Sequence, residues 1–115
     1  MNALTILYRA RTLIDLVGWC QHTSARDKNN RVVVPLSPQA AAYCAIGALY
    51  KVTDTGPLAN DNYELKQAKQ ALSATLYDRC KCTSIAHYND AACRTKDEVL
   101  SLFDAAILAQ EKLRK

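Results

Sequence analysis

The chain has 115 residues, a length that predicts one domain over residues 1–115 with enough buried surface for an independent core. Half of the residues are hydrophobic, which excludes a disordered chain, and Gly and Pro number three each, which favours helices. The formal net charge of +4 is a mild excess that allows an acidic or nucleic-acid partner without requiring one.

An amphipathic helix is predicted over residues 2–19. Its apolar residues recur at the spacing of one helical face and are Ala3, Ile6, Leu7, Ala10, Leu13, Ile14 and Val17. Arg9, Arg11 and Asp15 interrupt the apolar run, so the segment resembles neither a signal peptide nor a membrane span. We therefore expect a soluble, cytoplasmic protein without a membrane partner.

Residues 20–36 are expected to form a long loop or a minimal hairpin. The stretch from Asp27 to Asn30 favours a turn, because Asn and Asp tolerate left-handed backbone conformations. Residues 31–34 are mostly β-branched and end at Pro35, which indicates a short extended pair. Long ordered loops often carry function, so this segment is a candidate binding surface.

A central helix is predicted to begin at Ser37-Pro38, with Ser37 as the N-cap and Pro38 in the first helical position. The run from Ala40 to Leu49 is apolar nearly all round, as in a helix buried at the centre of a bundle. Gly47 lowers helix propensity, which predicts a close contact with a neighbouring element at this position.

A third helix is predicted after Asp61-x-x-Glu64, which resembles a capping pair. Thr83 or Ser84 is predicted to cap a short helix over residues 85–92. The core-facing residues of the third helix are Leu65, Ala68, Leu72 and Leu76.

The last helix is predicted to begin at Thr95-x-x-Glu98, a capping box in which each side chain bonds a backbone amide of the other residue. Its apolar stripe is Val99, Leu102, Phe103, Ala106, Ile107 and Leu113. The predicted fold is therefore all-α: a compact bundle of four main helices plus one short helix, with a long loop or minimal hairpin after the first.

Two groups of residues carry potential catalytic or metal chemistry. Cys80, Cys82, His87 and Cys93 supply zinc-type ligands, but their spacing differs from paired C-x-x-C knuckles, and free thiols are the ordinary interpretation. Cys44 with His87 and Asn89 or Asp90 supplies the residue types of a nucleophile system, but Cys44 lies in the most apolar predicted helix and is expected to be inert. We expect no catalytic residue, no metal and no cofactor.

The polar sequence Tyr88-Asn89-Asp90 precedes the last helix and is the sharpest candidate for a site. The candidate binding residues are Trp19, Arg26, Asp27, Arg31, Tyr88, Asn89 and Asp90. The alternative interpretation is a joint between helices, in which Asn89 or Asp90 bonds exposed amides or pairs with Arg26 or Arg94. The sequence favours the joint.

Four short motifs occur in a set order: Gly18-Trp19, Ala25-Arg26-Asp27, the Tyr43–Leu49 stretch similar to W-C-x-x-G-A-L, and Tyr88-Asn89-Asp90 before Thr95-x-x-Glu98-Val99. Together they resemble an uncharacterised family of small helical proteins found in actinobacteria and bacteriophages. The resemblance spans residues 6–108. Tyr43 and Tyr88 replace Trp, and Asn29-Asn30 stands where a Gly turn is expected. The resemblance implies a helical fold and a prokaryotic or phage origin, and transfers no catalytic residue.

The leading functional hypothesis is a non-enzymatic accessory protein of a phage or mobile element that binds a host protein, such as a defence complex, as an anti-CRISPR or other anti-defence inhibitor. The alternatives are a small-molecule or nucleotide-binding domain, with a pocket among Trp19, Arg26, Tyr88, Asn89 and Asp90, and a thiol- or metal-dependent enzyme. Nucleic acid is allowed but not favoured, because the basic residues are scattered and no recognition motif occurs. The sequence does not determine the oligomeric state.

Overall fold

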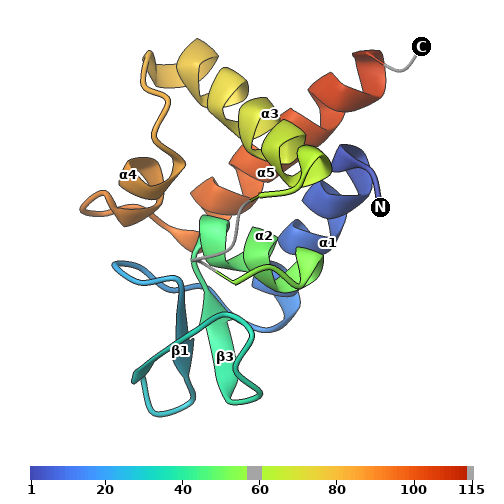
Figure 1. Ribbon diagram of the computed structural model, residues 1–115. Helices are drawn as coiled ribbons and strands as arrows, with labels where there is room; N and C mark the ends of the chain where they lie inside the picture. The colour runs from blue at the N-terminus through green and yellow to red at the C-terminus, as the bar shows by residue number, and fades with distance from the viewer. Residues whose placement is uncertain (57–60, 114–115) are drawn as a thin grey trace.

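The fold combines five helices with a three-stranded antiparallel sheet, as described for residues 1–56 and 61–113 by a computed structural model (Figure 1). The expectation of an all-α bundle is therefore wrong, and the fold is mixed α/β. The elements in chain order are α1 (Ala3–Leu16), β1 (Ala25–Asp27), β2 (Val32–Val33), β3 (Ala40–Tyr43), α2 (Ala45–Thr53), α3 (Tyr63–Cys80), α4 (Ile85–Asp90) and α5 (Lys96–Leu113). The sheet lies at one end of the helical layer, next to α2 (Figure 1).

Helix α1 contacts α2, α3 and α5, and α3 also packs on α5. The apolar stripe predicted for α3 is buried, and the stripe of α5 is buried except for Leu113, which is 77% exposed. In α1 the predicted face is buried as far as Ile14 except for Leu13, which is half-buried, whereas Val17 follows the helix and is exposed. The largest buried apolar side chains are Ile6, Leu7, Ile14, Leu49, Leu65, Leu72, Leu76, Leu102 and Phe103. Burial of each such side chain contributes about 1.5–3 kcal/mol.

Strands β1 and β2 form the short extended pair that the sequence allows after the first helix, with Arg26 opposite Val32. The turn between them is held by the Asp27 carboxylate, whose Oδ1 accepts hydrogen bonds from the backbone N–H groups of Asn29 and Arg31, both at 2.9 Å. Asn30 has a φ of 65°, a left-handed conformation that Asn tolerates better than most residues. Asn30 can therefore occupy a turn position where a Gly was expected.

Residues Ala40–Tyr43 form β3, where the sequence predicts the first turns of a central helix. This strand pairs antiparallel with β1, so β1 has a neighbour on both sides and the sheet order is β2-β1-β3. The helix prediction is wrong here because pairing with β3 satisfies the backbone groups on the edge of β1 that faces away from β2. Helix propensity is a weak preference that such tertiary pairing overrides.

Helix α2 consequently begins seven residues later than Ser37-Pro38 suggests, with Cys44 as its N-cap. The Cys44 thiol accepts a hydrogen bond from the backbone N–H of Gly47 at 3.2 Å. Ser37 instead stabilises a turn, since its Oγ accepts from the backbone N–H of Gln39 at 3.1 Å. Cys44 is thus a cap at the joint between the sheet and α2, not a residue inside a helix.

Gly47 lies against the backbone at the start of β1, which confirms the close contact predicted from its place in an apolar run. A Cβ atom at this position would lie 1.8 Å from the carbonyl oxygen of Ser24. The same carbonyl accepts a hydrogen bond from the backbone N–H of Cys44 at 3.1 Å. The first turn of α2 is therefore fixed directly on the chain that enters β1.

The capping predictions for the later helices are largely confirmed. Ser84 caps α4, its Oγ accepting from the backbone N–H of His87 at 3.1 Å. The N-cap of α3, however, is Asn62, because Asp61 instead pairs with Lys69 at 2.7 Å.

In the part of the chain that the structure describes, no helix is both long and apolar enough to cross a membrane.

Replacing Gly47 with Ala should destabilise the fold by at least about 2 kcal/mol, because the new methyl group overlaps a backbone oxygen that cannot move independently. The matched control is Gly56→Ala, since a Cβ atom there meets nothing within 4 Å. Urea denaturation of both variants measures the difference. Equal stabilities for the two variants would contradict the contact between α2 and β1.

Candidate functional site

Asn89, the centre of the predicted polar site, is a buried structural group with 1% of its surface exposed. Its Oδ1 accepts hydrogen bonds from the indole Nε1–H of Trp19 at 2.9 Å and the backbone N–H of Ala45 at 3.0 Å. Its Nδ2 donates to the backbone oxygen of Cys20 at 3.1 Å and to Oδ1 of Asp90 at 2.9 Å. These four bonds use both acceptor positions and both donors of the amide, so Asn89 has no capacity left for a ligand.

Asp90 connects the same joint to the segment that follows α1. Its Oδ1 also accepts from the backbone N–H of His22 at 2.9 Å. His22 has a φ of 70°, an uncommon conformation for a residue other than Gly, and this bond helps to hold it. The carboxylate therefore fixes the course of the chain between Trp19 and β1.

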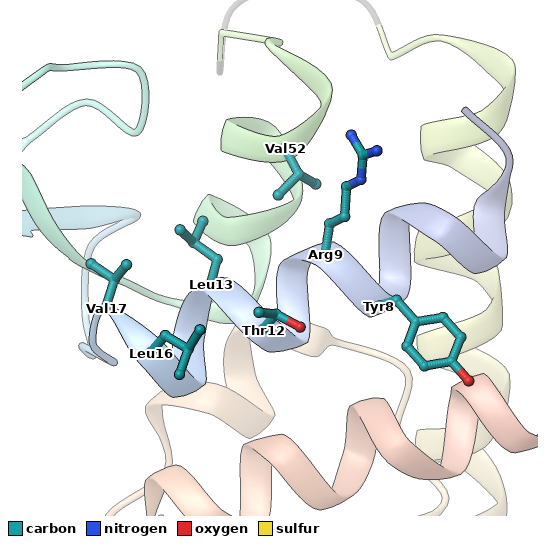
Figure 2. A pocket seen from close by; sticks show the side chains of 7 residues that line it. All are labelled: Tyr8, Arg9, Thr12, Leu13, Leu16, Val17 and Val52. Carbon is teal, nitrogen blue, oxygen red and sulfur yellow. The ribbon is translucent and has the colours of Figure 1, made fainter.

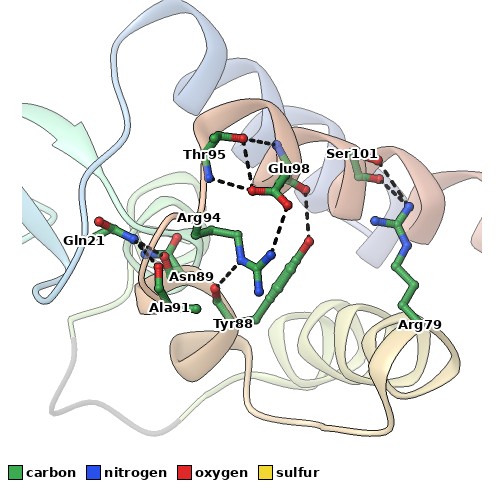
Figure 3. A network of polar contacts seen from close by, with 9 residues as sticks. All are labelled: Gln21, Arg79, Tyr88, Asn89, Ala91, Arg94, Thr95, Glu98 and Ser101. Carbon is green, nitrogen blue, oxygen red and sulfur yellow. Dashed lines mark hydrogen bonds and ion pairs between the residues drawn. The ribbon is translucent and has the colours of Figure 1, made fainter.

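Gln21 completes the attachment of this segment to α4. Its Nε2 donates to the backbone oxygens of Asn89 at 3.0 Å and Ala91 at 3.1 Å, which lie at and beyond the end of α4 (Figure 3). One side chain thus bonds two carbonyl groups at the end of α4, of which that of Ala91 also accepts from the backbone N–H of Arg94 at 3.1 Å. The predicted joint between helices is present, and it also joins them to the residues that lead into the sheet.

Tyr88 belongs to a second cluster, with Arg94 and Glu98 (Figure 3). Arg94 stacks over the Tyr88 ring, with its Cζ atom 3.7 Å from the ring centroid. Its Nε donates to the Tyr88 backbone oxygen at 2.8 Å. Its Nη1 also lies 3.2 Å from Glu98 Oε2. This geometry is a cation–π contact combined with an ion pair, and it holds α4 against the start of α5.

The capping box at the start of α5 has the predicted reciprocal bonds. The backbone N–H of Thr95 donates to Glu98 Oε1 at 2.9 Å, and the backbone N–H of Glu98 donates to Thr95 Oγ1 at 3.2 Å. The hydrogen bond from the Thr95 backbone, with a smaller effect of the Arg94 charge, lowers the pKa of the Glu98 carboxyl from its ordinary value. The Glu98 carboxylate thus caps α5 and pairs with Arg94.

The remaining predicted binding residues lie on the hairpin and bond mainly within it. Arg26 donates to the backbone oxygens of Asn30 at 3.1 Å and Gln21 at 3.3 Å. Asp27 holds the turn, and Arg31 is exposed on its far side. The structure therefore brings Trp19, Asn89 and Asp90 together, links Arg26 to them through Gln21, and leaves Asp27 and Arg31 outside the cluster.

A hollow of about 240 Å³ lies beside this joint, lined in part by Asp90, His22, Cys44 and Tyr50. Of the residues predicted to surround a small-molecule pocket, only Asp90 lines it. The other four, Trp19, Arg26, Tyr88 and Asn89, are not part of its wall.

The buried thiols are poorly suited to act as nucleophiles. Burial raises the pKa of the Cys44 thiol, although the N–H groups of Gly47 and Ile46 oppose this in part. Burial, assisted by the neighbouring Cys44, raises the pKa of Cys20 to about 11. A thiol with a raised pKa is protonated at neutral pH and unreactive.

The four residues considered as possible zinc ligands, Cys80, Cys82, His87 and Cys93, are not assembled into a metal site in the described structure. Within residues 1–56 and 61–113, no group of three or more His, Cys, Asp or Glu side chains is placed to hold a metal ion. Cys80 and Cys82 are close together, with 3.0 Å between their sulfur atoms, and Cys93 is exposed on the loop after α4.

An apolar groove runs along the outer face of α1, at a place that the sequence does not indicate (Figure 2). It has a volume of about 330 Å³ and is lined by Tyr8, Arg9, Thr12, Leu13, Leu16, Val17 and Val52. Leu16 is 76% exposed, Val17 49% and Tyr8 45%. The sequence places Val17 on the core face because its spacing matches, and only the position of α2 and α5 shows which part of α1 is uncovered.

Comparison with known proteins identifies a family but no activity. The family of unknown function DUF6197 matches residues 1–109, so the chain belongs to this family. No curated protein and no solved structure matches the chain.

Asn89→Ala should destabilise the protein by about 3 kcal/mol, because it leaves the Ala45 amide and the Cys20 carbonyl without their buried partner. Trp19 is the only tryptophan, so its fluorescence should change in the folded variant as the indole loses its acceptor. Urea denaturation followed by this fluorescence measures both effects. Asn29→Ala, on the exposed turn, is the control and should stay within about 0.5 kcal/mol of the unsubstituted protein. A comparably small effect of Asn89→Ala would contradict its role.

Proposed function

We propose that this member of the DUF6197 family is a non-enzymatic protein-binding domain, and that the α1 groove receives the partner. The observation that carries the proposal is the groove, in which large apolar side chains are exposed to water. The polar residues predicted to form a site, by contrast, are already hydrogen-bonded within the protein. Contiguous exposed apolar surface of this kind is typical of interaction sites.

The residues that line the groove are spaced so that a helix of a partner can lie along α1. Tyr8, Thr12 and Leu16 follow one another at four-residue spacing along α1, and Val52 of α2 stands opposite Leu13 on the other side (Figure 2). Tyr8 leans toward α5, where its hydroxyl group donates to Glu111 at 3.1 Å. An amphipathic helix that places apolar residues on one face can bury them between these side chains.

Burial of the exposed leucine supplies a driving force for such binding. Covering a Leu or Val side chain contributes about 1.5–3 kcal/mol relative to leaving it in water. Leu16 and Val17 are adjacent at the end of α1, so a partner that covers both would gain from each. Tyr8 adds an aromatic ring of the kind enriched at interfaces.

Arg9 is the charged residue among those that line the groove, and its positive charge favours an acidic partner. Arg11 is already paired, with its Nε 2.6 Å from Asp104 and its Nη1 3.6 Å from Asp15. Arg9 lines the groove, its guanidinium group extends away from α1, and it forms no ion pair with any described residue (Figure 2). We therefore propose as partner an amphipathic helix of another protein with an acidic residue beside its apolar face.

The narrower expectations from the sequence stay predictions. They are the phage or actinobacterial origin, the cytoplasmic location, the defence-complex partner with an anti-CRISPR or related role, and the alternatives of a small-molecule or nucleotide-binding domain and of a thiol- or metal-dependent enzyme. The expected binding surface of residues 20–36 with Asn89-Asp90 is less favoured than α1, because Asn89 is buried and fully hydrogen-bonded.

A photo-crosslinking amino acid at position 16, in cells that naturally make the protein, should capture a partner that the same amino acid at position 113 does not. Leu113 is the matched control because it is equally exposed but lies near the end of α5, outside the groove. The crosslinked peptide, identified by mass spectrometry, should come from an amphipathic helix with an acidic residue.

The purified partner should then bind Leu16→Glu and Arg9→Glu at least about tenfold more weakly than the unsubstituted protein, a loss of about 1.4 kcal/mol each. Leu113→Glu should bind normally, and Arg9→Lys should bind more tightly than Arg9→Glu. The proposal fails if positions 16 and 113 give the same crosslinks, if the captured chain is a second copy of this protein, or if Leu16→Glu binds as the unsubstituted protein does.

A further inference from the structure

Two cysteines at the end of α3, one exposed and one half-buried, form a pair that the protein-binding proposal does not use. Cys80 is the last residue of the helix, and Lys81 follows as its C-cap with a φ of 61°, which turns the chain back on itself. Cys82 is thereby brought beside Cys80, and the two sulfur atoms lie 3.0 Å apart. Cys80 is exposed, so small molecules in solution can reach it.

The surroundings of the two thiols make them chemically different. The hydrogen bond between the side chains, together with the backbone N–H of Cys82, lowers the pKa of Cys80, and the same side-chain bond raises the pKa of Cys82. The positive charge of Arg94 favours the thiolate at both positions. An exposed thiolate next to a second thiol is the arrangement in which one sulfur attacks a disulfide and the other resolves the product.

The other cysteines do not share this arrangement. Cys20 and Cys44 are buried, whereas Cys93 is exposed on the loop after α4 and has no sulfur–sulfur contact with a described cysteine. Cys93 therefore reports how an ordinary exposed thiol of this protein reacts, in the same sample.

We propose that Cys80 and Cys82 form a thiol–disulfide exchange site whose substrates are low-molecular-weight disulfides. The Cys80 thiolate attacks one sulfur of the disulfide RS–SR, forms a Cys80–S–S–R bond and releases RS⁻. Cys82 loses its proton to solvent, attacks the Cys80 sulfur and releases the second RS⁻. The cysteine pair is oxidised by two electrons to a Cys80–Cys82 disulfide, and RS–SR is reduced to two thiols.

The structure needs little change to complete this reaction. The sulfur atoms must approach from 3.0 Å to the disulfide length of about 2.05 Å. The movement involves the last residue of α3 and the residue after its cap, while the nearest buried leucine of the helix is Leu76, one turn earlier. The exposed Cys80 side chain can make this approach, while Cys82 stays packed against the edge of the core.

The test is to incubate the reduced full-length protein with oxidised glutathione, quench by alkylation and analyse the products by intact-protein and peptide mass spectrometry. The unsubstituted protein should acquire an internal Cys80–Cys82 disulfide and release two glutathione molecules for each pair. Cys82→Ser, which lacks the resolving thiol, should accumulate a glutathione mixed disulfide on Cys80. Cys80→Ser should react at Cys82 at least about tenfold more slowly than Cys82→Ser reacts at Cys80.

The same samples contain the outcomes that would overturn the proposal. One is a stable glutathione adduct on Cys80 or Cys82 of the unsubstituted protein without an internal disulfide. Another is reaction of Cys80 in Cys82→Ser at the rate of Cys93, since this would make Cys80 an ordinary exposed thiol. Circular dichroism of the serine variants checks that each is folded, which we expect because serine differs from cysteine only in its hydroxyl group.

Discussion

The amide of Asn89 is the interaction on which the rest of the fold depends, because its four hydrogen bonds join the segment after α1, the start of α2 and the end of α4. Its two acceptor bonds come from Trp19, after α1, and from Ala45, at the start of α2. A buried amide without partners would cost free energy that a small protein cannot easily offset, so all four bonds must form together. The position of the sheet beside the helices follows from this requirement, since β1 and β3 lie between the two segments.

The polar groups around Asn89 are hydrogen-bonded within the protein, which affects where a partner can bind. Asp90, Gln21 and Arg94 bond backbone and side-chain atoms of the protein itself, so the polar sequence before α5 acts as structural support. The outer face of α1, by contrast, carries exposed apolar side chains and Arg9, which forms no ion pair with any described residue. The α1 groove and the joint around Asn89 therefore use different residues, so the protein can bind a partner on α1 while this joint stays intact.

The features that the sequence predicts correctly are local ones. The capping box of Thr95 and Glu98 and the apolar stripe of α3 each depend on residues three or four positions apart, where helix geometry determines the contacts. The close contact at Gly47 was also predictable, because a Gly in an apolar run indicates crowding, although its partner near β1 was not.

The features that the sequence misses depend on distant partners. The alanines of β3 favour a helix when considered alone, and they become a strand only because β1 lies alongside. Asn89 and Trp19 are 70 residues apart, so no local pattern shows that their side chains bond. Leu16 and Val17 are apolar residues at a helix end, and their exposure follows only from which neighbouring helices cover α1.

Hydrogen exchange followed by NMR tests the central role of Asn89 most directly, because the Trp19 indole N–H and the Ala45 backbone N–H both donate to its Oδ1. If this joint holds the fold together, both protons should exchange only through global unfolding, with the same free energy as the most protected amides of α3 and α5. Exchange of either proton while the core amides stay protected would show that the joint opens independently, and would contradict this account.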